Sequence, residues 1–217
     1  MNYQPLHYIY QPATGTPTGT TLLLLHGTGG DERDLLPLAS YFGTGLNVLS
    51  VRGNVLEGGM PRFFRRLGMG VFDEEDVRFR THELAHFLQQ VSQREGFDVK
   101  QMVAVGYSNG ANIAGSLLLL YPELLAGAVL WRPMQPLTRE VPSPTTERRQ
   151  PVFFNPGSRD PTVDAAATDR YAALLTSAGF QLTRHDTPAG HNLTQADVLA
   201  GAAWFQKHFL LPAERSV

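Results

Sequence analysis

The stretch GYSNGANIA, which runs from Gly106 to Ala114, places one serine between two glycines that each lie two positions away. The apolar run MVAV precedes it, and the helix-like run SLLLLYP follows it. A Gly-x-Ser-x-Gly pentamer between a strand and a helix predicts a strained turn that holds the serine hydroxyl clear of the backbone, because the glycines leave room for neighbouring chain. We therefore predict that Ser108 lies at a strand-to-helix junction, as a candidate nucleophile.

Apolar, strand-like runs alternate with helical patterns on both sides of this turn. We expect strands over residues 7–10, 21–27, 46–53, 100–107, 126–131, 151–157 and 180–186, and helices over residues 34–42, 77–96, 109–121, 164–178 and 194–209. Nearly continuous apolar strands separated by helices indicate a mostly parallel sheet covered on both faces. The Pro-rich, polar segment 132–151 is too short for a separate cap domain, so we expect one α/β domain over residues 1–217.

Composition and charge exclude several classes of protein. The net charge is −2, whereas nucleic-acid binding leaves a concentrated basic footprint, so we expect no nucleic-acid partner. The absence of cysteine excludes a disulfide framework and a thiolate nucleophile. No apolar run approaches the length that spans a bilayer, and the N-terminal stretch lacks the pattern of a secretory signal. We expect a cytoplasmic protein, and the sequence leaves monomer and homodimer open.

The candidate nucleophile needs a base, because a serine alcohol reacts poorly until its proton is removed. With this type of turn the base is a histidine that follows the acid along the chain. His185 alternates with apolar residues in FQLTRHD and belongs to a strand, and His208 comes late in the last helix. His191 lies in TPAGHNLT, a glycine-bearing loop after the last strand. We predict that His191 is the base.

A carboxylate is expected to hold this histidine in the right tautomer. Asp160 stands in NPGSRDPTVD, in the loop after the strand PVFF. Asp164, in the same loop, is better placed to cap the next helix. Asp186 directly follows His185 and comes too late in the chain. We predict that Asp160 is the orienting acid.

Two backbone N–H groups are expected to stabilise the oxyanion that forms beside the serine. One is that of Asn109, which follows Ser108 at the start of a helix. The second comes from a loop after an earlier strand, and HGTGGDE, from His26 to Glu32, is such a loop. We predict the N–H of Thr28 as the second donor. His26 precedes Ser108 in the chain, so we expect it to be a structural hydrogen-bonding residue rather than the base.

The segment from Arg62 to Asp76 is the most individual part of the sequence. Its aromatic residues are candidates to line an acyl or aromatic pocket, and its arginines are candidates to hold a substrate carboxylate or phenolate. The alternative is that the arginines pair with the acidic residues of the same segment, which also suit the start of a helix. The candidate substrate-binding residues are Phe63, Phe64, Arg66 and Phe72, with Arg62 and Arg65 as further candidates for the anion.

A rival motif is HELAH, from His82 to His86, which matches the His-Glu-x-x-His signature of zinc proteases. That chemistry needs a third ligand. Gln89 and Ser92 stand where an extended motif requires glycine and histidine. The surrounding pattern fits ordinary packing of a helix on a sheet. We therefore expect no metal site.

The motifs together resemble a known family. LLLLHGTGGDERDLLPLA, RFFRRLGMGVFDEEDVRFRTHEL, GYSNGANIA, NPGSRDPTVD and AGHNLT are similar, in this order, to the phospholipase/carboxylesterase group of the α/β-hydrolase superfamily. The nearest branch is that of small bacterial carboxylesterases, related to acyl-protein thioesterases and to hydrolases linked to hydroquinone and catechol resistance. The resemblance implies an α/β-hydrolase fold without a large cap, no cofactor, and Ser108, Asp160 and His191 as the triad. Acyl-protein thioesterases differ at RFFRRL and DEED, so their substrate is not carried over.

The expected activity is hydrolysis of a small-molecule carboxylic ester through an acyl-enzyme. A thioesterase and an acyltransferase would use the same triad and remain alternatives, which product analysis separates. A catalytically inactive, hydrolase-like binding protein is the non-enzyme alternative. Such a protein usually lacks a triad member, whereas here each of the three positions is occupied.

Overall fold

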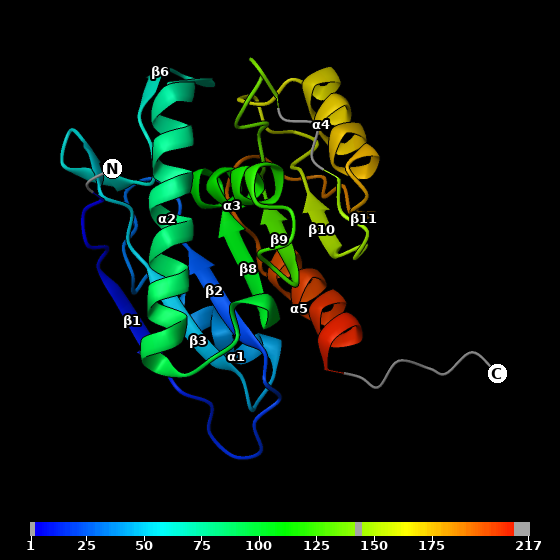
Figure 1. The fold of residues 1–217 in the computed structure, drawn as a ribbon. Helices are drawn as coiled ribbons and strands as arrows, with labels where there is room; N and C mark the ends of the chain where they lie inside the picture. Colours follow the sequence, from blue (N-terminus) through cyan, green and yellow to red (C-terminus); the bar gives the residue numbers. More distant parts are fainter. Residues whose placement is uncertain (1–2, 142–144, 211–217) are drawn as a thin grey trace.

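A seven-stranded sheet forms the centre of the protein in the computed structural model, which describes residues 3–141 and 145–210 (Figure 1). The strand order is β1-β3-β2-β8-β9-β10-β11. Only β1 runs antiparallel to its neighbour among the described strands of this sheet, so the predicted, mostly parallel sheet is confirmed. The strands are β1 (Tyr8–Gln11), β2 (Thr21–Leu25), β3 (Asn47–Val51), β8 (Met102–Tyr107), β9 (Gly127–Trp131), β10 (Pro151–Asn155) and β11 (Gln181–Arg184).

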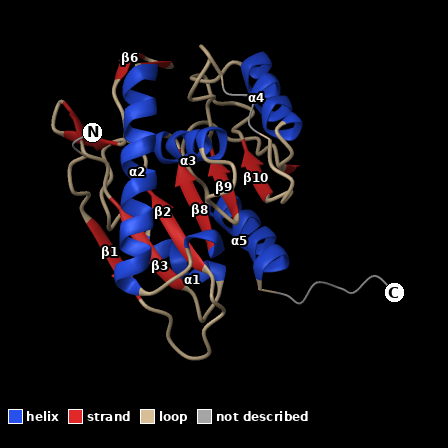
Figure 2. Ribbon diagram, in the orientation of Figure 1, coloured by secondary structure: helices blue, strands red, loops and turns tan. Residues whose placement is uncertain are grey.

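Helices cover both faces of this sheet (Figure 2). They are α1 (Ala39–Phe42), α2 (Glu74–Glu95), α3 (Asn109–Leu120), α4 (Ala165–Ser177) and α5 (Gln195–Phe209). The leucines of β2 alternate between the two layers: Leu23 and Leu25 join the core under α2, α3 and α4, and Leu22 and Leu24 join the core under α1 and α5. A central strand buried on both faces explains its unbroken apolar sequence.

The prediction of a helix over residues 34–42 is mostly wrong. The chain forms turns, a 3₁₀ segment (Leu36–Leu38) and then the single turn of α1. Pro37 lacks an N–H and disfavours the α conformation of the preceding residue, which explains why the helix does not extend towards the N-terminus. Asp31, which precedes these turns, accepts the N–H of Arg33 with its carboxylate at 2.7 Å and does not cap a helix.

Two small hairpins between β3 and α2 were not predicted. They are β4 (Val55–Glu57) with β5 (Met60–Arg62), and β6 (Arg66–Gly68) with β7 (Val71–Phe72). Helix α2 begins three residues before the expected Val77, with Glu74, Glu75 and Asp76 in its first turn. Asp73 caps it by accepting the N–H of Asp76. The acidic run therefore serves the helix N-terminus, as the alternative interpretation proposed.

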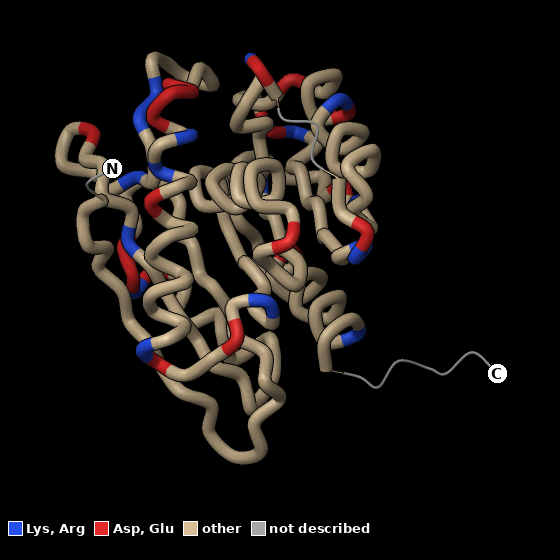
Figure 3. Tube along the Cα trace, viewed as in Figure 1, with Lys and Arg blue, Asp and Glu red and all other residues tan. Residues whose placement is uncertain are grey.

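Charged residues of both signs are interspersed along the trace (Figure 3). Lys and Arg number 18 and Asp and Glu number 20, so the two signs nearly balance. Among the described residues, no helix is long and apolar enough to cross a membrane.

Candidate active site

Ser108 occupies the turn between β8 and α3, as predicted. Its φ of 52° and ψ of −113° lie in a sparsely populated region for a residue with a side chain. Its N–H donates to the carbonyl of Trp131 at 2.9 Å, at the end of the adjacent strand β9. This conformation costs on the order of 1–3 kcal/mol and is kept only where the surroundings hold it. The turn places the hydroxyl beyond the carboxyl ends of β8 and β9, where sites form in parallel sheets.

The two glycines of the pentamer are required by close approach of the backbone. A Cβ at Gly106 would lie 2.5 Å from the carbonyl oxygen of Gly110, and a Cβ at Gly110 would lie 1.9 Å from that of Leu25. Neither distance is compatible with a side chain, so the glycines let α3 begin directly against β2 and β8.

We expect the substitution Gly110→Ala to destabilise the protein by about 3 kcal/mol, because the new methyl group would displace the backbone of β2. Urea denaturation, followed by circular dichroism, measures the free energy of unfolding. Gly68→Ala is the matched control, since a Cβ there meets no atom within 4 Å. That control should change stability by less than about 0.5 kcal/mol. Equal stability of both variants would contradict the close-approach argument.

Three residues that are far apart in the sequence converge at this turn. The Oγ of Ser108 lies 2.9 Å from Nε2 of His191, and Nδ1 of His191 lies 2.6 Å from Oδ2 of Asp160. The other two histidines that follow Ser108 lie elsewhere: His185 stacks on Phe153, and Nδ1 of His208 lies 2.8 Å from the carbonyl oxygen of Trp204. The structure thus brings together the predicted serine, histidine and aspartate.

Asp160 is buried and its two oxygens have different partners. Oδ2 faces His191, and Oδ1 accepts the N–H of Thr162 at 2.9 Å and its hydroxyl at 2.6 Å. Burial raises the pKa of Asp160, but the hydrogen bonds from Thr162 and His191 outweigh it, so that the pKa lies below its ordinary value. The carboxylate is therefore charged at neutral pH. Thr162 was not predicted, although a threonine two residues after an aspartate is a common turn pattern.

Arg132, a second residue that was not predicted, fixes the loop that carries His191 by hydrogen bonds to its backbone. Its guanidinium donates to the carbonyl of Gly190 at 2.8 Å and to that of Asn192 at 3.2 Å, on either side of His191. Arg132 is 1% exposed and pairs with the buried Asp197 at 2.6 Å. Tyr107 also donates its hydroxyl to the carbonyl of His191, at 3.1 Å. The backbone of the histidine is thus fixed at three consecutive residues.

The amides of Thr28 and Asn109 are free to bind a ligand. Neither N–H donates to another residue in the described part of the chain, whereas the neighbouring N–H of Gly29 donates to Pro61 at 3.0 Å. His26 is buried within the same loop: its Nδ1 lies 2.6 Å from the carbonyl oxygen of Gly27, and its Nε2 accepts the N–H of Gly53 at 3.1 Å. Burial lowers the pKa of His26, which keeps it neutral and suits the expected structural role.

Comparison with known proteins places the chain in a family. A family model described as alpha/beta hydrolase fold matches residues 68–177. Hydrolase MhqD of Bacillus subtilis (strain 168) is 41% identical over 202 residues, which cover 93% of this chain and 98% of that protein. The chain belongs to the α/β-hydrolase family. Among solved structures, the carboxylesterase of Bacillus cereus matches with a TM-score of 0.88 and 46% identity, over 93% of this chain and 94% of that one.

A more distant relative of this α/β hydrolase is acyl-protein thioesterase 1 of Cryptococcus neoformans. It is 26% identical over 184 residues, which cover 77% of each chain. The predicted fold class and the predicted family are therefore confirmed, and the chain is a carboxylesterase-like α/β hydrolase.

The pocket at Ser108 in this α/β hydrolase has a volume of about 260 Å³. Two of the four predicted substrate-binding residues, Arg66 and Phe72, line it. Phe63 and Phe64 do not; they are 4% and 0% exposed and belong to the core. Phe64 lies behind the wall: its ring meets that of Phe72 edge-on, with the ring centroids 5.1 Å apart, and the Arg62 guanidinium lies over it at 5.8 Å. The wall is formed by Thr28, Arg62, Arg66, Met69, Gly70, Phe72, Tyr107, Ser108, Asn109, Asn112, Met134, Thr162 and His191.

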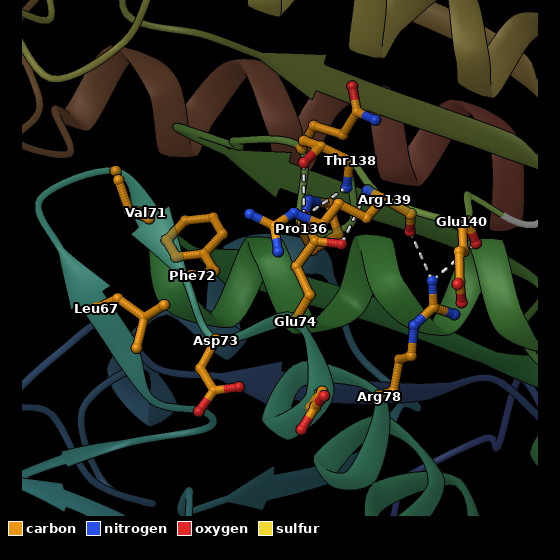
Figure 4. A pocket seen from close by; sticks show the side chains of 13 residues that line it. Leu67, Val71, Phe72, Asp73, Glu74, Arg78, Pro136, Thr138, Arg139 and Glu140 are labelled. Carbon is orange, nitrogen blue, oxygen red and sulfur yellow. Dashed lines mark hydrogen bonds between the residues drawn. The ribbon is translucent and has the colours of Figure 1, made fainter.

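A larger hollow of about 690 Å³ adjoins this pocket and shares Gly70 and Phe72 with it (Figure 4). Glu74 reaches across it and accepts the N–H and hydroxyl of Thr138, at 3.0 and 2.6 Å, and the N–H of Arg139 at 2.9 Å. These bonds join α2 to the segment after β9. No serine, cysteine or histidine is among the described residues that line this hollow, so its greater size does not make it the reaction site.

The HELAH motif forms no metal site in the described residues, where no group of three or more histidines, cysteines or carboxylates could hold an ion. Nδ1 of His82 lies 2.6 Å from the hydroxyl of Tyr121 instead. The motif serves the packing of α2 against the end of α3.

Proposed function

We propose that this protein is a serine hydrolase that cleaves small carboxylic esters through an acyl-enzyme on Ser108. The observation that carries the proposal is the continuous chain of contacts from the Ser108 hydroxyl to His191 and from His191 to the charged Asp160, at 2.9 and 2.6 Å. Each residue has one role: Ser108 is the nucleophile, His191 the general base and Asp160 the orienting acid.

In the first half-reaction, the Oγ of Ser108 attacks the ester carbonyl while Nε2 of His191 takes the hydroxyl proton. The carbonyl oxygen becomes an oxyanion, which the free N–H groups of Thr28 and Asn109 bind. Each such donor contributes on the order of a hundredfold or more to kcat. Asp160 stabilises the protonated imidazole. The tetrahedral intermediate collapses as the bond to the leaving oxygen breaks, and His191 returns its proton to the departing alcohol.

In the second half-reaction, a water molecule replaces the alcohol. His191 takes a proton from the water, whose oxygen attacks the acyl carbonyl, and Ser108 leaves with the proton from His191. The carboxylic acid is released. A thioester passes through the same acyl-enzyme, and the acyl-protein thioesterase relative keeps thioester cleavage as the second candidate function. Paired oxygen and sulfur esters of one acyl group, compared by kcat/KM, distinguish the two; product analysis with added alcohol reveals acyl transfer.

An active-site-directed fluorophosphonate tests the proposal. We expect one phosphonyl group per chain, attached to Ser108, because its hydroxyl lies beside a base and faces two free amides. Mass spectrometry of the intact protein and of its peptides measures the stoichiometry and the site. Urea-unfolded protein is the control and should remain unlabelled. Labelling at a different residue, or no labelling of the folded protein, would reject the proposed nucleophile and favour an inactive binding protein.

A further inference from the structure

Two guanidinium groups line the pocket that holds Ser108. They belong to Arg62 and Arg66, and no aspartate or glutamate is among the residues that form the wall. The imidazole of His191 lines the same wall. A pocket of about 260 Å³ therefore presents two fixed positive charges close to the reacting hydroxyl.

Arg62 is fixed in place although it is nearly inaccessible. Its side chain is 3% exposed, its Nε donates to the carbonyl of Phe64 at 3.1 Å, and its Nη1 donates to the hydroxyl of Thr28 at 2.6 Å. Its Nη2 donates to no residue in the described ranges. Burial and the neighbouring Arg66 lower the pKa of Arg62, and the Glu57 carboxylate opposes this shift. Through its hydrogen bond to Thr28, Arg62 also connects this side of the pocket to the loop whose Thr28 amide is the proposed oxyanion donor.

One carboxylate serves both arginines. Oε1 of Glu57 accepts a hydrogen bond from Nε of Arg66 at 2.8 Å. Oε2 of Glu57 lies 3.3 Å from Nε of Arg62 and makes no hydrogen bond with it. Within the described residues, the hydrogen-bond partner of Nη1 of Arg66 is the thioether sulfur of Met69, at 3.1 Å, which is a weak acceptor. The three charges sum to one net positive charge, and donors of both guanidinium groups remain for a ligand.

Arg65 shows the contrasting arrangement. It pairs with Asp73 at 3.0 Å, is 61% exposed and does not line the pocket. The three arginines of one short segment thus divide into one that satisfies the start of α2 and two that are turned to the reaction site.

We propose that Arg62 and Arg66 form an anion subsite and that the preferred substrate is an ester carrying a carboxylate group a short distance from the scissile bond. The inference rests on the proposed function. Charge-assisted hydrogen bonds from guanidinium to carboxylate are strong and geometrically selective. In a confined pocket they orient the ester carbonyl towards Ser108 and reject a neutral group of the same size, because the guanidinium donors would then stay unpaired.

Two matched pairs of esters test the subsite. Monoethyl succinate and ethyl succinamate place a carboxylate or a neutral amide on the acyl side, and meta-acetoxybenzoate and meta-acetoxybenzamide place them on the leaving side. We expect kcat/KM to favour the carboxylate member by about 10- to 100-fold in one pair. The pair that shows the preference identifies the side on which the anion binds.

Variants assign the preference to the guanidinium groups. Arg66→Gln should lower the carboxylate-to-amide ratio about tenfold, and Arg66→Lys, which keeps the charge, should retain part of it. Arg65→Gln is the matched control and should leave the ratio unchanged. Ratios at or below one in both pairs, or no hydrolysis of any member by protein that the phosphonate labels at Ser108, would overturn the subsite alone. Unlabelled protein without hydrolysis would instead reject the proposed function.

Discussion

Replacing Ser108 with alanine is expected to lower kcat for ester hydrolysis by about 10⁶-fold, the loss seen when the nucleophile of a comparable triad is removed. The reason is geometric. The hydroxyl lies 2.9 Å from Nε2 of His191, which can take its proton, whereas the methyl group of alanine offers no atom to attack the carbonyl. The residual rate should be that of binding and oxyanion stabilisation alone. Initial rates with an activated aryl ester, at saturating concentration, measure the effect.

The variant should keep its fold, so that the loss is chemical. Alanine carries the same Cβ as serine and therefore the same backbone strain at a φ of 52°. Far-ultraviolet circular dichroism and the urea midpoint check this. Ser177→Ala is the matched control, because Ser177 lies on α4 and donates only to the carbonyl of Leu174, at 2.9 Å. A Ser108→Ala protein that retains a rate within about tenfold of the parent, far above the expected loss, would rule out Ser108 as nucleophile.

The central strands of the sheet were predictable because they are buried on both faces. Their apolar runs contain almost no polar positions, as in β2, where Leu22 to Leu25 are all fully buried. The hairpins β4–β5 and β6–β7 were not predictable, because their strands are two or three residues long and show no alternation of apolar and polar residues. Tertiary contacts hold them: the N–H of Phe63 donates to the side chain of Asn109 at 2.7 Å, and that of Arg65 to Asp76 at 2.7 Å.

The serine, aspartate and histidine could be selected from sequence because each follows a strand of a parallel sheet, and the carboxyl ends of such strands meet at one edge. The residues that hold them could not. Thr162, Tyr107 and Arg132 act through hydrogen bonds to Asp160 and to the loop of His191, which exist only after the loops converge. A signal for Arg132 was present: a lone arginine follows the strand AGAVLW.

The second prediction with a large expected effect concerns Arg132, because its guanidinium donates to four residues and has no access to solvent. Besides the carbonyls of Gly190 and Asn192, it donates to Oδ1 of Asn155 at 2.6 Å and to Oδ2 of Asp197 at 2.6 Å. Its own φ of 55° is unusual for a side-chain-bearing residue. Arg132→Met removes the charge and keeps much of the apolar volume. We expect a loss of about 3–5 kcal/mol, the cost of leaving a buried charge without its partner.

The unpaired charge would be that of Asp197, which also receives the N–H and hydroxyl of Thr194 at the start of α5. Burial raises the pKa of Asp197, but the bonds from Arg132, Thr187 and Thr194 outweigh it and lower the pKa to about 2. In the parent, this carboxylate therefore stabilises the fold above about pH 4, the pKa of an unfolded aspartate, and the contribution is lost as the pH falls towards 2.

Arg132→Met should reverse that dependence. Without the guanidinium, only the hydrogen bonds from Thr187 and Thr194 oppose burial, so we expect the pKa of Asp197 to rise above its unfolded value. The carboxylate would then destabilise the fold at high pH, and protonation would relieve the cost as the pH falls. The stability deficit should be larger at pH 8 than at pH 5. Arg132→Met/Asp197→Asn removes the charge and should recover part of the deficit at pH 8. Urea unfolding of parent, single and double variants at both pH values measures this. A deficit independent of pH and of Asp197→Asn would show that Arg132 contributes only by packing.

The same variant separates stability from positioning. Because Arg132 fixes the backbone on both sides of His191, its loss should let the imidazole move relative to Ser108, and a displacement of about 1 Å costs on the order of a hundredfold in rate. We therefore expect kcat of the folded Arg132→Met protein to fall by about that factor while KM changes little, since Arg132 does not line the pocket. The double variant should regain stability but not kcat, because asparagine at position 197 supplies no donor to the carbonyls of Gly190 and Asn192. Recovery of kcat together with stability would mean that the slow rate came from unfolding, and that the guanidinium does not position the histidine.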